Sequence, residues 1–102
     1  MSFDLDDVKV IESDEDASEE EFWVSVQRAI NSGTAWSLQG SYGRLMMQGI
    51  KAGRCLLGEN ECRDYYDNRI PSRSQVEAGT KGSREHVVAA FGEDWAVLME
   101  NA

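Results

Sequence analysis

The residues best suited to covalent or metal chemistry are two cysteines and one histidine. Cys55 and Cys62 are seven positions apart, and His86 is the single histidine among 102 residues. A structural zinc site usually takes four ligands in paired clusters, and a catalytic thiol needs a base and an orienting group within reach. The sequence shows neither pattern. It therefore predicts two free thiols, no metal, no cofactor and no enzymatic activity, with a Cys62–His86 nucleophilic pair as the enzymatic alternative.

A short glycine-rich stretch and a group of acids also bear on ligand binding. Residues 79–83 read Gly-Thr-Lys-Gly-Ser, which lacks the spacing of a phosphate-binding loop and is better explained as a turn capped by Ser83. The acids between residues 59 and 67 do not match the spacing of a calcium loop. Neither stretch predicts a ligand.

A mixture of basic and aromatic residues points instead to a macromolecular partner. Such mixtures occur where proteins bind nucleic-acid backbones and at the energetic centres of protein interfaces. The net charge of −9 disfavours nucleic acid, so a protein partner is predicted. The candidate partner-binding residues are Arg44, Lys51, Arg54, Arg63, Tyr65, Tyr66, Arg69 and Arg73.

A long amphipathic helix is predicted to position the first three of these residues. It covers residues 38–57 within the glycine-punctuated stretch 34–58, and its apolar side chains fall within about 140° of one another. Arg44, Lys51 and Arg54 lie on the opposite side. The pattern therefore predicts a central helix with one buried face and one cationic flank.

Two glycines within the apolar face need an explanation, because each costs about 1 kcal/mol relative to alanine inside a helix. Gly49 and Gly53 are four positions apart. Their favoured role is to make room for a bulky side chain such as Trp23 or Trp95. Two alternatives are a close approach by a second helix, and a helix that ends at Gly53 in a left-handed cap.

Capping signals predict the helix before the central one. Ser18 and Glu21 have capping-box spacing, so a helix should begin at Glu19 and end at Gly33. The short turn that follows predicts an antiparallel hairpin with the central helix.

After the central helix, the signals are more irregular. Residues 59–72 include the only proline and predict a long loop or a small irregular hairpin. Ser72 and Ser83 are predicted to begin two further helices, and Asp94 to cap a last helical turn. Residues 18–102 are thus predicted to form one all-α domain, a small bundle of four or five helices around the central helix.

The negative charge is concentrated at the start of the chain. The first 21 residues hold ten acids and Lys9, so they account for the entire net charge of −9. Because like charges repel, residues 1–17 are predicted to form an acidic, largely flexible arm, with a short ordered segment over residues 7–12 as the alternative. The arm is read as a solubilising tail or as a mimic of DNA phosphates.

Location and assembly follow from length and hydropathy. The chain shows neither a leader sequence nor an apolar run of membrane-spanning length, which predicts a cytoplasmic protein without a membrane partner. The domain without its arm is small enough that a single core gives only a few kcal/mol, so a homodimer is also allowed.

Three stretches resemble small uncharacterised proteins of actinobacterial phages: residues 38–44, residues 64–73 and residues 79–83. The resemblance implies a phage or prophage origin, and hence location in a host cytoplasm, but transfers no activity. Taken together, the sequence predicts a non-enzymatic interaction or modulator protein that binds a host or phage protein through residues 59–73 and the cationic flank. The alternative is a nucleic-acid-related protein, acting as a DNA mimic through the arm or binding phosphate or nucleotide weakly through its arginines and tyrosines.

Overall fold

The computed structural model describes residues 3–13, 16–38 and 40–102, so the expectations for residues 1, 2, 14 and 15 and for Gln39 lie outside it. Its α-helices are α1 (Leu5–Glu12), α2 (Glu19–Ser32), α3 (Gly40–Ala52), α4 (Arg84–Phe91) and α5 (Glu93–Glu100). Two 3-10 turns, η1 (Thr34–Ser37) and η2 (Arg73–Gln75), accompany them. A small antiparallel hairpin pairs β1 (Cys62–Arg63) with β2 (Arg69–Ile70). The prediction of an all-α domain is confirmed in part: the described part of the chain is mostly helical, with five α-helices, and residues 59–72 include the small hairpin that was one of the two forms expected there.

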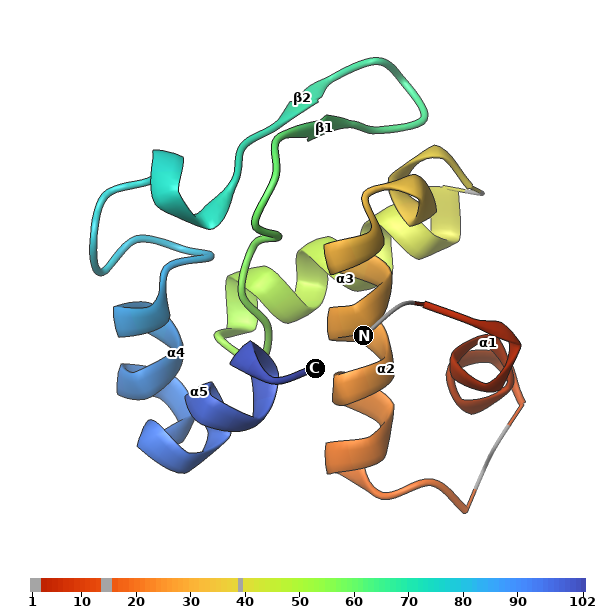
Figure 1. Cartoon of the computed structure of the whole chain (residues 1–102), viewed down its shortest axis with the longest axis horizontal. Helices are drawn as coiled ribbons and strands as arrows, with labels where there is room; N and C mark the ends of the chain where they lie inside the picture. Colours follow the sequence, from red (N-terminus) through yellow and green to blue (C-terminus); the bar gives the residue numbers. More distant parts are fainter. Residues whose placement is uncertain (1–2, 14–15, 39) are drawn as a thin grey trace.

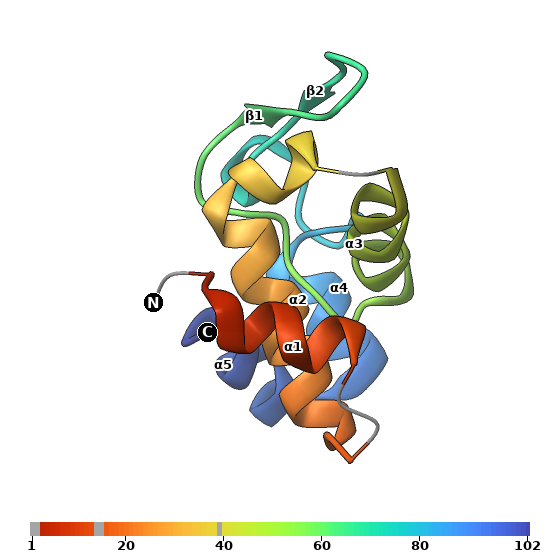
Figure 2. The same ribbon diagram turned by 90° about the vertical axis from the view of Figure 1, so that its right-hand side faces the viewer.

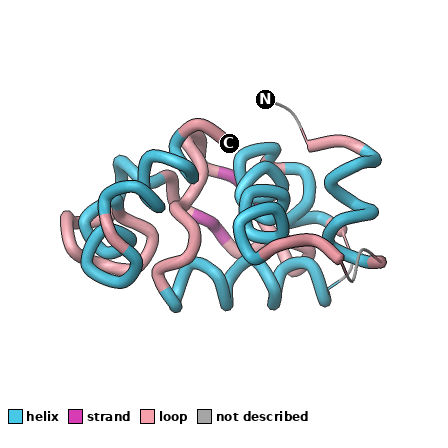
Figure 3. The backbone as a smooth tube through the Cα atoms, turned by 90° about the horizontal axis from the view of Figure 1, so that it is seen from below, coloured by secondary structure: helices cyan, strands magenta, loops and turns pink. Residues whose placement is uncertain are grey.

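The helix around which the others pack is α2 (Figure 1). It begins as predicted, because the Ser18 hydroxyl accepts a hydrogen bond from the Glu21 amide at 3.1 Å, and it ends at Gly33 with φ +73°. Val26, Ala29 and Ile30 are almost completely buried. Viewed along its axis, α2 has α1 on one side, α4 and α5 on the other, and α3 across a third (Figure 3).

The predicted long helix over residues 38–57 is wrong in its extent. The helix α3 begins at Gly40 and ends at Ala52, and Thr34–Ser37, just before the predicted helix, form η1. Gly53 adopts φ +83°, and a Cβ there would lie 2.5 Å from the Cβ of Ala90. Position 53 therefore excludes other residues both by backbone conformation and by packing. The alternative of a left-handed cap at Gly53 is confirmed.

The predicted antiparallel hairpin of α2 and α3 is also not observed, since α3 crosses α2 rather than running alongside it (Figures 1 and 3). The two faces of α3 do follow the prediction. Tyr42, Met46 and Ile50 are buried, whereas Arg44 and Lys51 are exposed. The same apolar pattern therefore gives a shorter helix with the expected inner and outer sides.

Gly49 makes room for a bulky side chain, as predicted. A Cβ at this position would lie 2.7 Å from Cζ3 of Trp23 and 3.2 Å from Sγ of Cys55. Only glycine lets α3 approach the indole of α2 this closely.

A buried glutamine holds the segment that follows α3. Cys55, Leu56 and Leu57 are buried without belonging to a helix or strand. The Gln27 side chain, 0% exposed, accepts a hydrogen bond from the Leu56 amide at 2.7 Å and donates one to the Leu56 carbonyl at 3.0 Å. It thus replaces the backbone partner that a strand would supply, because buried peptide groups need hydrogen bonds.

The prediction of a largely flexible arm is wrong over Leu5–Glu12, which form α1 against α2 (Figure 2). Asp7 is 2% exposed and accepts hydrogen bonds from Ser25 at 3.0 Å and from Arg28 at 2.9 Å. Phe3 adds an edge contact to Tyr42, with ring centroids 6.4 Å apart. A buried carboxylate paired in this way offsets the repulsion expected from the acidic composition.

The C-terminal third follows the predicted caps in part. The Ser83 hydroxyl accepts from the His86 amide at 3.2 Å at the start of α4, and Gly92 with φ +95° separates α4 from α5. Two predictions need correction. The helix expected after Ser72 is only the single turn η2, and Asp94 lies inside the first turn of α5 rather than capping it.

Candidate functional site

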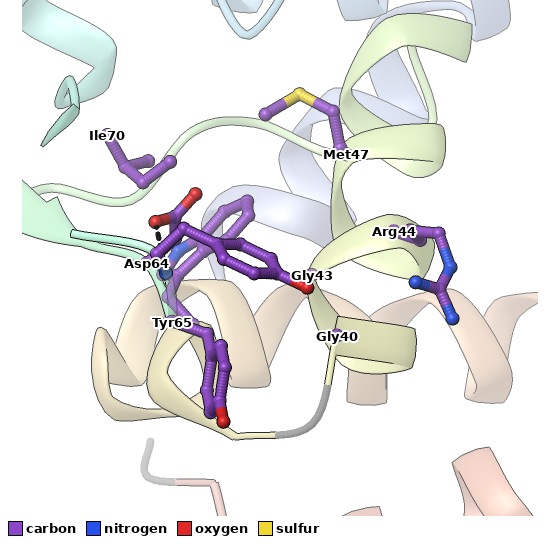
Figure 4. Close-up of a pocket in the computed structure, with 9 residues that line it drawn as sticks. Gly40, Gly43, Arg44, Met47, Asp64, Tyr65 and Ile70 are labelled. Atoms are coloured by element: carbon purple, nitrogen blue, oxygen red, sulfur yellow. Dashed lines mark hydrogen bonds between the residues drawn. The ribbon is translucent and has the colours of Figure 1, made fainter. Parts of the chain in front are cut away.

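A pocket of about 220 Å³ opens between the β1–β2 hairpin and the first turns of α3. The apolar residues Trp36, Met47 and Ile70 line it, each from a different element. Arg44 and the tyrosines Tyr65 and Tyr66 also line it. In Figure 4, Asp64 and Tyr65 approach from the hairpin, whereas Gly40, Gly43, Arg44 and Met47 lie along α3.

The two tyrosines at the hairpin tip are the most solvent-exposed aromatic side chains among the described residues. Tyr65 is 63% exposed and Tyr66 is 71% exposed. Their rings contact each other edge to face, with centroids 5.2 Å apart. Large aromatic side chains left open beside a pocket are a frequent feature of protein-binding surfaces.

Asp64 fixes the turn that presents these tyrosines. Its carboxylate accepts hydrogen bonds from the Tyr66 amide at 2.9 Å and the Asn68 amide at 2.8 Å. Asp67 completes the turn with φ +65°, a conformation that aspartate tolerates better than most residues. The tip is therefore held by the ionised Asp64 side chain, which accepts hydrogen bonds from backbone amides of the same turn.

We expect the order of this tip to depend on pH. Hydrogen bonds, first from the Asn68 backbone and then from its side chain and from the Tyr66 amide, lower the pKa of Asp64 below its ordinary 3.8. A lowered folded-state pKa means that the stabilisation is present above the ordinary value and is lost as the pH falls through the lowered one. The amide signals of Tyr66 and Asn68 should therefore move with a midpoint below pH 3.8, in stronger acid than an aspartate without these hydrogen bonds would require. Asp64→Asn should give shifted signals already at pH 7, and unchanged signals in that variant would contradict this role.

Arg44 stands at the rim of the pocket without an ionic partner in the described part of the chain. Its guanidinium extends outward from α3 in Figure 4. A Cβ on Gly40 would lie 3.3 Å from Nη1 of Arg44 and 3.6 Å from the Tyr66 hydroxyl oxygen. The glycine thus leaves space for the Arg44 and Tyr66 side chains beside the start of the helix.

A second, shallower depression continues from the pocket along α3. It has a volume of about 550 Å³ and shares Arg44 and Met47 with the pocket. We call it the α3 groove, and its lining is completed by Gln48, Lys51 and Ala52. Lys51 is exposed and has no ionic partner among the residues that the structure describes. The pocket and the groove together form one surface. The pocket forms its apolar end, and Arg44 and Lys51 supply two positive charges along α3.

The cations of the hairpin itself are already paired. Arg63 lies 3.8 Å from Asp67, and Arg69 forms an ion pair with Glu61. Both pairs are solvent-exposed, so they contribute little stability, but they reduce the positive charge that the hairpin offers to a partner.

Two of the predicted residues have structural partners away from the pocket. The Arg73 side chain donates to the Leu57 carbonyl at 2.7 Å and to Asn31 at 3.3 Å, which ties η2 to the core. The Arg54 guanidinium lies over three aromatic rings, at 4.4 Å from Phe91, 5.6 Å from Trp23 and 5.8 Å from Trp95. The structure therefore brings together Arg44, Tyr65, Tyr66 and Lys51, and not Arg54 or Arg73.

Sequence reasoning missed the apolar wall of the pocket. Trp36, Met47 and Ile70 come from η1, α3 and β2, and no spacing rule links them. Residues 38–44 and 64–73, which are distant in the sequence, meet at this pocket.

The thiols and the histidine lie in different surroundings. Burial raises the pKa of the Cys55 thiol, and burial followed by the charges of Asp64 and Glu61 raises the pKa of Cys62. His86 lies 3.2 Å from the Lys51 carbonyl, at the far end of α3. Among residues 3–13, 16–38 and 40–102, no group of three or more histidine, cysteine, aspartate or glutamate side chains is placed to hold a metal ion. A raised pKa leaves little thiolate, the form that acts as a nucleophile.

Comparisons with protein-family models, with curated proteins and with solved structures give no match for this chain. None of the described helices is long and apolar enough to cross a bilayer. The functional argument therefore depends on the geometry of the pocket and the α3 groove.

Proposed function

We propose that this chain is a non-enzymatic interaction protein that binds a protein partner through the pocket and the α3 groove. The observation that carries the proposal is the pair of exposed tyrosines beside an apolar pocket. Burying such rings on association removes apolar surface from contact with water, which favours binding. Tyrosine and arginine are also among the residue types that contribute most binding energy at protein interfaces.

The size of the pocket favours a protein side chain over a small-molecule substrate. Sites for drug-sized ligands usually enclose about 300–1,000 Å³. The pocket, at 220 Å³, is smaller and is open to the groove beside it. A modulator encoded by a phage or prophage, acting on a host or phage protein in the host cytoplasm, fits such a surface. That origin rests on the resemblance of residues 38–44, 64–73 and 79–83 to phage proteins.

The nucleic-acid alternative has less support. Among the six candidate cations, Arg54, Arg63 and Arg69 have carboxylate partners, and Arg73 is bonded to the core. Affinity for a phosphate backbone grows with the number of phosphates neutralised, and Arg44 and Lys51 supply two charges. Mimicry of DNA by the acidic segment keeps one favourable observation: Asp4, Asp6 and Glu12 are exposed on an ordered helix. It stands as the second candidate.

Partner capture tests the proposal. Tagged full-length protein would be recovered from the source cells and its co-purifying proteins identified and quantified. Tyr66→Ala should lower recovery of the specific partner at least tenfold, since a buried tyrosine anchor typically contributes 2 kcal/mol or more. Val97→Ala on α5 is the matched control, because Val97 is exposed and lies outside the pocket and the groove. Equal recovery by folded Tyr66→Ala would remove the hairpin tip from the interface.

A further inference from the structure

The charge of the binding surface contrasts with that of the molecule. The chain has a net charge of −9, yet Arg44 and Lys51 both line the α3 groove without a carboxylate partner in the described residues. Several arginines elsewhere are paired: Arg28 with Asp7, Arg63 with Asp67, and Arg84 with Glu93 and Glu100. Arg73 is bonded to the Leu57 carbonyl, and Lys9 and Lys81 stand singly, away from the groove, without a carboxylate partner among the described residues. Arg44 and Lys51 thus place unpaired positive charge along the groove, next to the apolar pocket of an acidic protein.

The apolar end of the surface is shaped for one side chain. Trp36, Met47 and Ile70 line the pocket, and the tyrosines stand beside its mouth. An aromatic side chain inserted there would meet the thioether of Met47 and the indole of Trp36, contacts that aromatic rings favour. A charged or short polar side chain would lose its hydration against Met47 and Ile70, whose side chains offer it no strong hydrogen-bond partner.

The distance between Arg44 and Lys51 along α3 determines how far apart the carboxylates of a bound segment should be. Arg44 borders both the pocket and the groove, whereas Lys51 is seven residues further along α3. At 1.5 Å per residue, the two cations are about 10 Å apart along the helix axis. A bound segment would therefore carry one carboxylate close to its aromatic anchor and another about 10 Å further on.

We infer that the partner presents an acidic segment with an aromatic anchor: the ring enters the pocket, and carboxylates beside it pair with Arg44 and Lys51. This inference rests on the proposed function and adds to it the chemistry of the partner. A second copy of this chain is a poorer occupant, because two molecules of charge −9 repel each other. Its exposed tyrosines beside Asp64 and Asp67 also line its own copy of the pocket, and the exposed apolar residue beside the acids of α1 is Leu5 rather than an aromatic.

The test uses fluorescein-labelled dodecapeptides and full-length protein. One peptide carries a central tryptophan with glutamates on both sides. A second has alanine in place of the tryptophan, and a third has glutamine in place of every glutamate. Binding is followed by fluorescence anisotropy, and the contacted residues are identified from amide shifts of labelled protein. We expect the first peptide to bind at least tenfold more tightly than either of the others and to shift Met47, Tyr65 and Tyr66.

Charge-reversal variants complete the test. Arg44→Glu and Lys51→Glu should each weaken binding of the acidic tryptophan peptide about tenfold, and added salt should weaken wild-type binding. Lys81→Glu is the matched control, since it changes the net charge equally at an exposed residue outside the groove. Equal binding of the glutamine peptide, or no effect of the two reversals, overturns the inference while the surface remains a docking site. The absence of shifts at Tyr65 and Tyr66 with every peptide, together with full partner recovery by Tyr66→Ala, overturns the proposed function as well.

Discussion

Gln27→Ala is expected to lower the free energy of unfolding by about 4 kcal/mol. The substitution removes both partners of the Leu56 peptide group, whose amide and carbonyl bond to the glutamine at 2.7 Å and 3.0 Å. Each buried group left without a partner costs about 1–3 kcal/mol, and the lost side chain also leaves a cavity. Domains of this size have a total stability of about 5–15 kcal/mol, so the variant should lie close to its unfolding threshold.

Urea denaturation followed by circular dichroism measures this effect. Gln48→Ala is the matched control, because Gln48 is an exposed glutamine on α3, and it should change stability by no more than about 0.5 kcal/mol. If Gln27→Ala is too unstable to purify, amide exchange at Leu56 in the wild-type protein gives the same information, since a clamped amide should exchange only with global unfolding. A Gln27→Ala protein as stable as wild type would show that the clamp carries little energy.

Arg54→Ala is expected to cost about 2–3 kcal/mol of stability. The Arg54 guanidinium lies within 5.8 Å of the ring centres of Phe91, Trp23 and Trp95. The hydrogen bond from Nε1 of Trp95 to the Arg54 backbone carbonyl, at 2.8 Å, is retained in the alanine variant. The side chain therefore joins α2, α4 and α5 to the end of α3. Cation–ring contacts contribute about 0.5–2 kcal/mol, and the aliphatic stem adds packing.

Arg54→Lys and Lys51→Ala separate this structural role from a role in binding. The lysine variant keeps the charge but loses the planar group, so it should recover about half of the lost stability. Lys51→Ala should leave stability unchanged, because Lys51 is exposed. If Arg54→Ala remains as stable as wild type but loses its partner, Arg54 belongs to the binding surface, as the sequence predicted.

Helix caps and apolar spacing, which depend on residues close together in the sequence, correctly predicted several helix ends and the two faces of α3. The start and end of α2 follow from Ser18 and Gly33, and the start of α4 follows from Ser83, since a cap depends on the backbone within a few residues. The mostly helical character and the two faces of α3 follow in the same way from the spacing of apolar side chains.

The errors concern contacts between distant parts of the chain. The apolar period continues through Leu57, but Gln27 and Gly82 supply hydrogen bonds to Leu56 and Leu57 that make a non-helical segment stable there. The acidic segment forms α1 because Ser25 and Arg28, 18 and 21 residues away, bond to Asp7. Amino-acid composition predicts repulsion among the acids, but it does not reveal that Ser25 and Arg28 bind one of them and offset that repulsion.

The candidate site was predicted by residue type and only partly by position. Tyr65 and Tyr66 stand together because the hairpin tip is a local structure, and Asp64 within the same turn holds it. Arg54 was grouped with Arg44 and Lys51 because helical spacing placed all three on one flank, and Arg73 was included because it is a cation close in sequence to the tyrosines. Their partners, three rings for Arg54 and the Leu57 carbonyl for Arg73, come from distant segments.

The central claim is that a partner protein contacts the hairpin tip and the α3 groove. Site-specific photo-crosslinking in the source cells tests it most directly: a photoreactive phenylalanine analogue replaces Tyr66 in one protein and Val97 in another. The account predicts a discrete crosslinked product from position 66, lost when Arg44→Glu is introduced into the same protein, and none from position 97. Crosslinking from position 97 alone, or none from position 66 in a protein that still captures its partner, would contradict it.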